Sequence, residues 1–220
     1  MSSYSKPCVL VTGFTPFDGE SINPSWQLAQ QLEGETLEGH IIHTKELPCE
    51  FDTSIASLTK AIDKYHPSVV ICLGQAGGRC DISIERIAIN INDARIADNA
   101  GNQPIDTPVV AHGPDAYFTT LPIKSMLKSA IQAGVPTSIS HTAGTYVCNH
   151  VMYGLLHYLS THDLACRGGF VHIPYLPSQA AHHSGAPSME IDTLVKGIKI
   201  LITSAITQKQ DIKLVAGTTH

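Results

Sequence analysis

Ser68-Val69-Val70-Ile71-Cys72-Leu73 is the clearest strand signal in this chain, and the fold class follows from it. Every residue after Ser68 is apolar, which is the pattern of a parallel β-strand that is buried on both faces of its sheet. The run stops at the glycine-rich loop Gly74-Gln75-Ala76-Gly77-Gly78. A strand covered on both faces needs helices on both sides of the sheet, so this run predicts an α/β protein.

Strand-like and helix-like segments alternate on either side of this run. Strands are predicted at residues 8–12, 41–47, 84–92, 137–140 and 169–173, and helices at residues 51–65, 122–133, 148–159 and 191–202. Another helix is predicted from Asn23-Pro24, because Asn is a favoured N-cap and Pro is favoured at the first helical position. The alternation favours a single-domain layer sandwich, with a mostly parallel twisted sheet flanked by helices. We expect one domain over residues 1–220, with a core of about residues 7–208.

Residues 93–121 break the alternation. They are rich in Gly, Pro, Asn and Asp and have little hydrophobic periodicity. They predict a long excursion from the sheet, which could contain a hairpin. Loops of this length are usually functional or cover something, so a lid over a site is one option that the sequence leaves open.

Composition excludes several classes of function. The formal net charge is -5, and the 14 Lys and Arg residues form no cluster, which argues against binding to nucleic acid or to an anionic membrane surface. No apolar run approaches the ~20 residues that span a bilayer, and Met1-Ser2-Ser3-Tyr4-Ser5-Lys6 lacks the apolar region of a secretory signal. The six cysteines are dispersed, without a C-x-x-C pair or zinc-finger spacing. We therefore expect a cytoplasmic protein without a metal site.

Three residues carry the chemistry that the sequence suggests. Cys148 lies in Gly144-Thr145-Tyr146-Val147-Cys148-Asn149-His150, where a turn meets a predicted helix. His172 lies near the end of a predicted strand, and Glu85 lies near the start of another. A thiol, an imidazole and a carboxylate are the attacking group, the proton shuttle and the imidazole-orienting group of a nucleophilic hydrolase.

The expected position of Cys148 at a helix N-terminus matters for its chemistry. Unpaired backbone N–H groups and the helix dipole there favour an anion, so they should lower the thiol pKa and could hold an oxyanion. The alternative is a buried structural cysteine, which is common for free Cys. We expect that alternative for the other cysteines, since Cys8 and Cys72 lie inside apolar strands.

The partners of Cys148 also have ordinary alternatives. His172 stands among Phe, Val and Ile, where a hydrogen-bonded core histidine is common, but it lies near a strand end where α/β proteins place their sites. Glu85 could simply occupy the solvent face of a strand. If the two side chains meet, Glu85 would hold the imidazole in the tautomer that proton transfer requires.

Two loops after predicted strands suggest a small-molecule pocket. Phe14 and Phe17 flank a proline in a polar loop and could form a slot for a small flat ligand, or could pack beneath the loop. The loop at Gly74 matches neither the P-loop nor the dinucleotide-binding pattern, so we interpret it as a turn that closely approaches a pocket.

Taken together, these segments resemble the pyroglutamyl peptidase type I family (pyrrolidone-carboxylate peptidase). The likeness runs from about residue 8 to about residue 205. The stretches that carry it are Val11–Phe17, Asn23–Ser25, Leu73–Arg79, Glu85–Asn90, Asn92–Ile96, Gly144–Asn149 and Phe170–Pro174. Ser83-Ile84 departs from the Thr-Pro-like pair expected before Glu85, which could alter the local turn.

The resemblance implies a single catalytic domain and a cysteine exopeptidase that removes an N-terminal pyroglutamyl residue through a thioester acyl-enzyme. Cys148 would be the nucleophile, His172 the general base and then acid, and Glu85 the residue that orients His172. Arg95 would stabilise the oxyanion, while the substrate pocket would be lined by Phe14, Phe17, Asn23, Gln75, Tyr146 and Val147. The family resemblance further implies a cytoplasmic homotetramer that uses no cofactor.

Two other functions remain open from the sequence alone. An enzyme of the purine nucleoside phosphorylase type could share such a scaffold, but it would need a phosphate site. A non-catalytic binding protein could have kept the pocket and lost turnover, although the Cys, His and Glu set argues against it.

Overall fold

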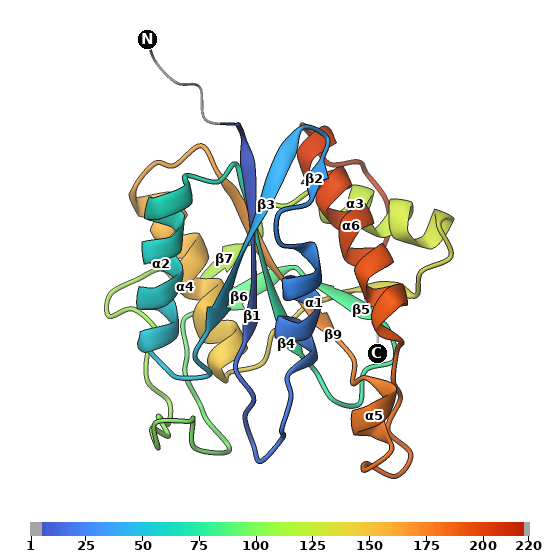
Figure 1. Ribbon diagram of the computed structural model, residues 1–220. Coiled ribbons are helices and arrows are strands. Elements are labelled where there is room, and N and C mark those ends of the chain that lie inside the picture. The colour runs from blue at the N-terminus through green and yellow to red at the C-terminus, as the bar shows by residue number, and fades with distance from the viewer. Residues whose placement is uncertain (1–5, 218–220) are drawn as a thin grey trace.

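The computed structural model describes residues 6–217, arranged as a twisted sheet with helices on both faces (Figure 1). Within these residues a seven-stranded sheet has the order β2-β3-β1-β4-β9-β5-β8, and a two-stranded sheet pairs β6 with β7. The strands are β1 (Cys8–Phe14), β2 (Thr36–Leu37), β3 (His40–Leu47), β4 (Val69–Gln75), β5 (Ile82–Glu85), β6 (Ile87–Ile89), β7 (Ala116–Phe118), β8 (Thr137–Ser140) and β9 (Arg167–Ile173). The helices are α1 (Pro24–Leu32), α2 (Thr53–Tyr65), α3 (Ile123–Gln132), α4 (Val147–Thr161), α5 (Pro177–Ala180) and α6 (Ile191–Thr207). Residues 1–5 and 218–220 lie outside the described residues. Both stretches are also outside the part of the sequence that resembles the family.

The apolar run that opened the sequence analysis forms β4, at the centre of the sheet. β4 pairs in parallel with β1 on one side and with β9 on the other, and all its residues up to Gly74 are buried. The prediction of a doubly covered parallel strand is therefore confirmed. The mostly parallel α/β fold class is confirmed as well.

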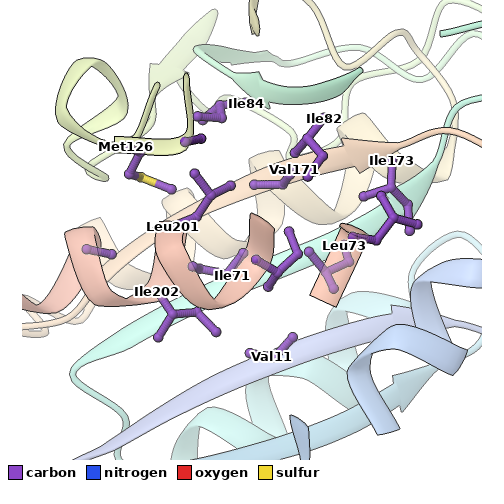
Figure 2. Close-up of a cluster of buried hydrophobic side chains, with 14 of the residues drawn as sticks. Val11, Ile71, Leu73, Ile82, Ile84, Met126, Val171, Ile173, Leu201 and Ile202 are labelled. Carbon is purple, nitrogen blue, oxygen red and sulfur yellow. The ribbon is translucent and has the colours of Figure 1, made fainter. Parts of the chain in front are cut away.

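Two hydrophobic layers cover the two faces of the sheet because side chains alternate along each strand. Ile71 and Leu73 of β4 belong to a cluster that also contains Leu201 and Ile202 of α6 (Figure 2). Val70 and Cys72, which point to the other face, pack in the cluster with α2 and α4. None of the helices in the described part of the chain is long and apolar enough to cross a membrane.

Helix α1 shows how local sequence sets an element boundary. Its N-cap is Asn23, whose side chain accepts a hydrogen bond from the backbone N–H of Ser25, and Pro24 occupies the first helical position. Both features were predicted from the sequence. The buried face of the helix consists of Pro24, Ser25, Leu28, Ala29 and Leu32.

The single strand predicted over residues 84–92 is wrong. The chain forms β5 in the main sheet, breaks at Arg86, and continues as β6 in the small sheet. At Arg86 the chain changes its hydrogen-bond partners. The Arg86 backbone N–H donates to the Ser140 carbonyl at the end of β8, whereas its carbonyl accepts from the Thr119 N–H, just after β7. The excursion over residues 93–121 does return to pair, since β7 is antiparallel to β6 and Asn92 bridges Thr107.

The directions of β5 and β8 also differ from a simple parallel sheet. These two strands are parallel to each other, but β5 is antiparallel to β9, with Ser83 opposite His172. The turn that precedes Cys148 follows β8, so it does not leave the same edge as the ends of β4 and β9. The turn over residues 141–146 leads from the end of β8 into α4, as the sequence predicted for a turn that precedes a helix.

Candidate active site

Cys148 lies in the first turn of α4, directly above the sheet. The helix begins at Val147 with Tyr146 as its N-cap, so the Cys148 backbone N–H is among those that lack an intrahelical partner. The sulfur lies over Gly74, where an added Cβ would be only 3.0 Å from Sγ. Gly74 is the register partner of His172 in the β4–β9 pair, so the thiol and the imidazole share one region of the same sheet face.

His172 and Glu85 meet in the protein interior. His172 Nδ1 lies 2.7 Å from Glu85 Oε1, and both side chains are buried. The contact arises from register: Ser83 is opposite His172, and Glu85, two residues further along, points to the same face and reaches back to the ring. Because Nδ1 is engaged by the carboxylate, Nε2 is the ring nitrogen left for proton exchange.

Burial and the contact between the two side chains have opposing effects on the pKa values of His172 and Glu85. Burial lowers the pKa of His172, the Glu85 hydrogen bond and charge oppose this, and the Arg79 charge adds to the decrease. Burial alone would raise the pKa of Glu85, but its hydrogen bond with His172 and the charges of His172 and Arg79 leave that pKa lowered. The resting pair is therefore a neutral imidazole beside an ionised carboxylate at neutral pH.

The pKa of the Cys148 thiol is shifted in the direction opposite to the one expected at a helix N-terminus. Burial raises the pKa of Cys148 well above its usual value, Cys49 and Glu85 add to the increase, and only the Arg79 charge opposes it. Desolvation thus acts against the effect expected of the helix N-terminus, and the resting thiolate stays a prediction. The raised pKa of Cys148 and the lowered pKa of His172 both favour the uncharged pair of thiol and imidazole.

The two residues after Cys148 anchor the neighbouring segment to α4. The Asn149 amide accepts from Ile89 N–H and donates to the Ile89 and Ile91 carbonyls, at 2.9–3.0 Å. His150 Nε2 accepts from the backbone N–H of Asp52 at 2.8 Å, so Nδ1 donates to Asn92 Oδ1 at 3.0 Å. Both side chains are fully buried.

This anchored segment carries Arg95 to the site. Asp93 N–H donates to the Thr145 carbonyl, Thr145 Oγ1 donates to the Asp93 carbonyl at 2.7 Å, and Tyr146 Oη donates to the Ala97 carbonyl at 3.0 Å. The loop is thus tied to the residues immediately before Cys148. The exposed Arg95 side chain faces a cavity there.

A cavity of about 360 Å³ opens beside the first turn of α4. Its lining includes four of the residues expected at the site: Phe17, Gln75, Arg95 and Tyr146. Asp18, Glu20, Asp93 and His183 also border it, so its rim carries more acidic than basic groups.

The other residues expected to bind substrate lie deeper in the protein. Phe14 is buried, with its ring centroid 6.3 Å from that of Phe170, and Val147 is buried in the same cluster. Asn23 is buried too, where it caps α1 and donates to the Thr15 carbonyl. These three residues are therefore not among those that line the cavity.

Sequence reasoning missed several polar residues that build this site. Arg79 reaches Glu85, and Asn149 and His150 fix the loop, but none was assigned a role. Asp98 was also missed; its carboxylate accepts from the backbone N–H groups of Phe51, Ala100 and Asn102. The available signal was the occurrence of Asn and His inside an otherwise apolar helical run, since buried polar groups need partners.

Comparisons with known proteins agree on one family. A family model described as pyroglutamyl peptidase matches residues 7–208. Pyrrolidone-carboxylate peptidase 1 of Photorhabdus laumondii is 57% identical over 217 residues, covering 96% of this chain and 99% of that protein. A pyrrolidone-carboxylate peptidase of Escherichia fergusonii is 55% identical, with coverage of 96% and 99%. The crystal structure of pyroglutamyl peptidase I from Bacillus amyloliquefaciens superposes with a TM-score of 0.93 at 44% identity, covering 96% of this chain and 100% of that one.

Proposed function

The chain belongs to the pyroglutamyl peptidase family and is a hydrolase, and from this premise we propose that it removes N-terminal pyroglutamyl residues through a Cys148 thioester. The observation that carries the proposal is the buried His172–Glu85 pair on the same sheet face as the Cys148 sulfur. These groups are the three parts that acyl transfer by a thiol requires. The adjoining cavity has space for a five-membered lactam.

Recognition of the substrate would rest on shape and neutral hydrogen bonds. Phe17 and Tyr146, whose ring centroids are 6.3 Å apart, would form the walls of the slot. Phe14 is buried against Phe170 and would support the site from the interior. Gln75 Oε1 accepts from Gln179, which orients the Gln75 amide so that its N–H group can donate to the lactam carbonyl. A proline residue has no such carbonyl and would leave this donor unpaired, which disfavours it strongly.

The resting protonation states imply concerted general-base catalysis. Neutral His172 would take the thiol proton on Nε2 as Sγ bonds to the carbonyl carbon of pyroglutamate. The Cys148 backbone N–H and Arg95 would stabilise the oxyanion. The C–N bond then breaks, His172 returns the proton to the leaving amine, and water activated by His172 hydrolyses the thioester to release pyroglutamic acid.

The direct test is hydrolysis of a fluorogenic pyroglutamyl amide, with the prolyl amide as a control. We expect cleavage of the pyroglutamyl compound alone, and its loss after treatment with iodoacetamide. Absence of cleavage by folded, reduced protein would overturn the proposal and would favour a binding protein that has lost turnover.

Variants of two cysteines test the nucleophile. Cys148→Ala should abolish turnover without unfolding the protein, and Cys148→Ser should fail too, because the alcohol is far less acidic than the thiol. Cys80→Ala is the matched control, since Cys80 is an exposed free cysteine. Full activity of Cys148→Ala would contradict the mechanism.

We propose a cytoplasmic location on the basis of the dispersed cysteines and the family resemblance, and a homotetramer on the basis of the resemblance alone. Cell fractionation tests the first. Sedimentation of the purified protein tests the second, because a monomer at micromolar concentration would exclude a stable tetramer.

A further inference from the structure

Arg79 joins two of the three segments that carry the proposed triad. Its Nη1 lies 2.7 Å from Glu85 Oε1, and its Nη2 donates to the Thr142 carbonyl at 3.3 Å. Thr142 belongs to the turn that leads from β8 into α4 and Cys148. One guanidinium group therefore connects the carboxylate behind His172 with the approach to the nucleophile.

The Glu85 carboxylate has an asymmetric set of contacts. Its Oε1 accepts from both Arg79 and His172, at 2.7 Å each, whereas Oε2 is buried and accepts no hydrogen bond among the described residues. Both donors therefore meet at one oxygen, so the position of Oε1 against His172 Nδ1 depends on Arg79 as well as on the imidazole. The Arg79 guanidinium is planar and makes a charge-assisted contact to Oε1 through Nη1, while its Nη2 is held by the Thr142 carbonyl.

The local backbone aims Arg79 at this position. Gly78 has φ +88°, a conformation that favours glycine, and the Arg79 backbone N–H closes the turn by donating to the Ala76 carbonyl. On the far side, the Thr142 turn is held by its own contacts: Ser140 Oγ donates to the Thr142 carbonyl, and Gly144 N–H donates to Thr142 Oγ1. Arg79 thus bridges two ordered turns.

We infer that Arg79 is a positioning residue for the proposed hydrolysis: it fixes the Glu85 carboxylate against His172 and ties the turn before Cys148 to it. The inference rests on the proposed function. Within residues 6–217, Arg79 supplies a positive charge that acts on both reacting groups, where it favours thiolate and disfavours imidazolium. The titratable and charged groups involved are Glu85 from β5, Cys148 from α4, Cys49 and Cys72 beside the thiol, and Arg79 itself.

The test compares Arg79→Gln and Arg79→Lys with the native enzyme on the pyroglutamyl amide. Arg167→Gln is the matched control, because it removes an arginine at the far end of β9. For Arg79→Gln we expect kcat to fall about tenfold to a hundredfold with little change in KM, since misplacement of a reacting group costs rate more than binding. The acid limb of the kcat/KM profile should move to higher pH, because the His172 pKa rises when the cation is lost.

Arg79→Lys separates charge from geometry. Lys keeps the positive charge, so the acid limb of the kcat/KM profile should return to its native position. A single ammonium group cannot reproduce the two guanidinium contacts to Glu85 and Thr142, so kcat should recover only in part. Native kcat and pH profile in folded Arg79→Gln would overturn the inference. If Arg79→Gln does not fold, the lysine variant decides, and native kcat in Arg79→Lys would overturn it. An inactive native enzyme would instead refute the proposed function.

Discussion

Gly74 provides the space in which the Cys148 sulfur lies. A Cβ at this position would be 2.7 Å from the Phe170 ring and 3.0 Å from Sγ, so any side chain must displace the ring, the sulfur or the strand. Phe170 in turn packs against His172, with ring centroids 4.8 Å apart. The absence of a side chain at Gly74 therefore leaves room for both the Cys148 sulfur and the Phe170 ring, which packs against His172.

Gly74→Ala should reduce kcat at least tenfold, since a sub-ångström displacement of the thiol disturbs the reacting geometry. Steady-state kinetics on the pyroglutamyl amide measures the loss. Gly168→Ala is the matched control, because its Cβ would meet Leu159 at 2.8 Å, equally crowded but at the opposite end of β9. The control should lose stability while the folded enzyme keeps its kcat. Equal kcat in the two variants would contradict this role for Gly74.

Helix α4 combines the proposed nucleophile and two anchoring residues in its first turn. Asn149 and His150 follow Cys148 directly and fasten residues 89–92 to the helix. Burial lowers the pKa of His150 to about 4, an effect that the charges of Asp52 and Asp98 only partly oppose. The helix therefore depends on a histidine that stays neutral.

This histidine makes stability depend on pH. In the unfolded chain His150 takes up a proton below about pH 6.5, but the folded protein resists this until about pH 4. The contribution of neutral His150 to the free energy of unfolding is fully present above the unfolded pKa, and it is lost as the pH falls from about 6.5 to about 4. At about 1.4 kcal/mol per pKa unit, the loss is about 3.5 kcal/mol.

His150→Gln should lower stability at pH 7 but flatten its decline between about pH 6.5 and pH 4. Urea unfolding at several pH values measures both effects. Glu85 and Asp98, whose pKa values are also lowered, contribute to the decline in every variant, so the difference from native protein isolates His150. The exposed His182→Gln is the control and should leave the slope unchanged. A native slope in His150→Gln would refute the assignment.

Elements with strong periodic or apolar patterns could be predicted from the sequence. β8 has the predicted bounds, and α6 begins where its apolar face begins. The break at Arg86 could not be predicted, because Ile84–Asn92 keeps its alternation while the backbone changes partners through tertiary hydrogen bonds. Strand direction is equally hidden, since β5 would have the same pattern in either orientation.

The proposed site was predictable to the extent that its chemistry is local. Cys148 sits beside a turn and a helix start, which are visible in the sequence. Arg79 acts through contacts with Glu85 and Thr142, one near and one distant in the chain, and no local pattern signals such a bridge. The desolvation that raises the pKa of the half-buried Cys148 likewise depends on the whole fold.

On the scale of the whole molecule, the segment after α6 closes the structure over its own earlier parts. The Asp211 carboxylate accepts from the backbone N–H groups of Lys124 and Ser125 and from Ser125 Oγ, at 2.8–2.9 Å. It thereby supplies the N-terminal cap that Pro122 cannot provide for α3. The Ala216 carbonyl accepts from both Lys124 and Arg86.

Asp211→Ala should destabilise the protein by about 1 kcal/mol, the usual cost of losing a helix cap. For a chain of this size, that corresponds to a decrease in Tm of about 2–4 °C, measurable by calorimetry. Lys213→Ala, an exposed neighbour in the same segment, is the control. An unchanged Tm in Asp211→Ala would show that the cap contributes nothing.

The closing segment has a practical consequence for anyone who labels or immobilises this protein. Residues 209–217 follow the region matched by the family model, yet Ala216 contacts the arginine next to Glu85. A fusion partner or surface linker attached beyond residue 217 would put strain on the hydrogen bond between the Ala216 carbonyl and Arg86, the residue that follows Glu85. A group attached ahead of β1 precedes an inner strand, between β3 and β4, and leaves the Ala216–Arg86 contact untouched, so that end is the better point of attachment.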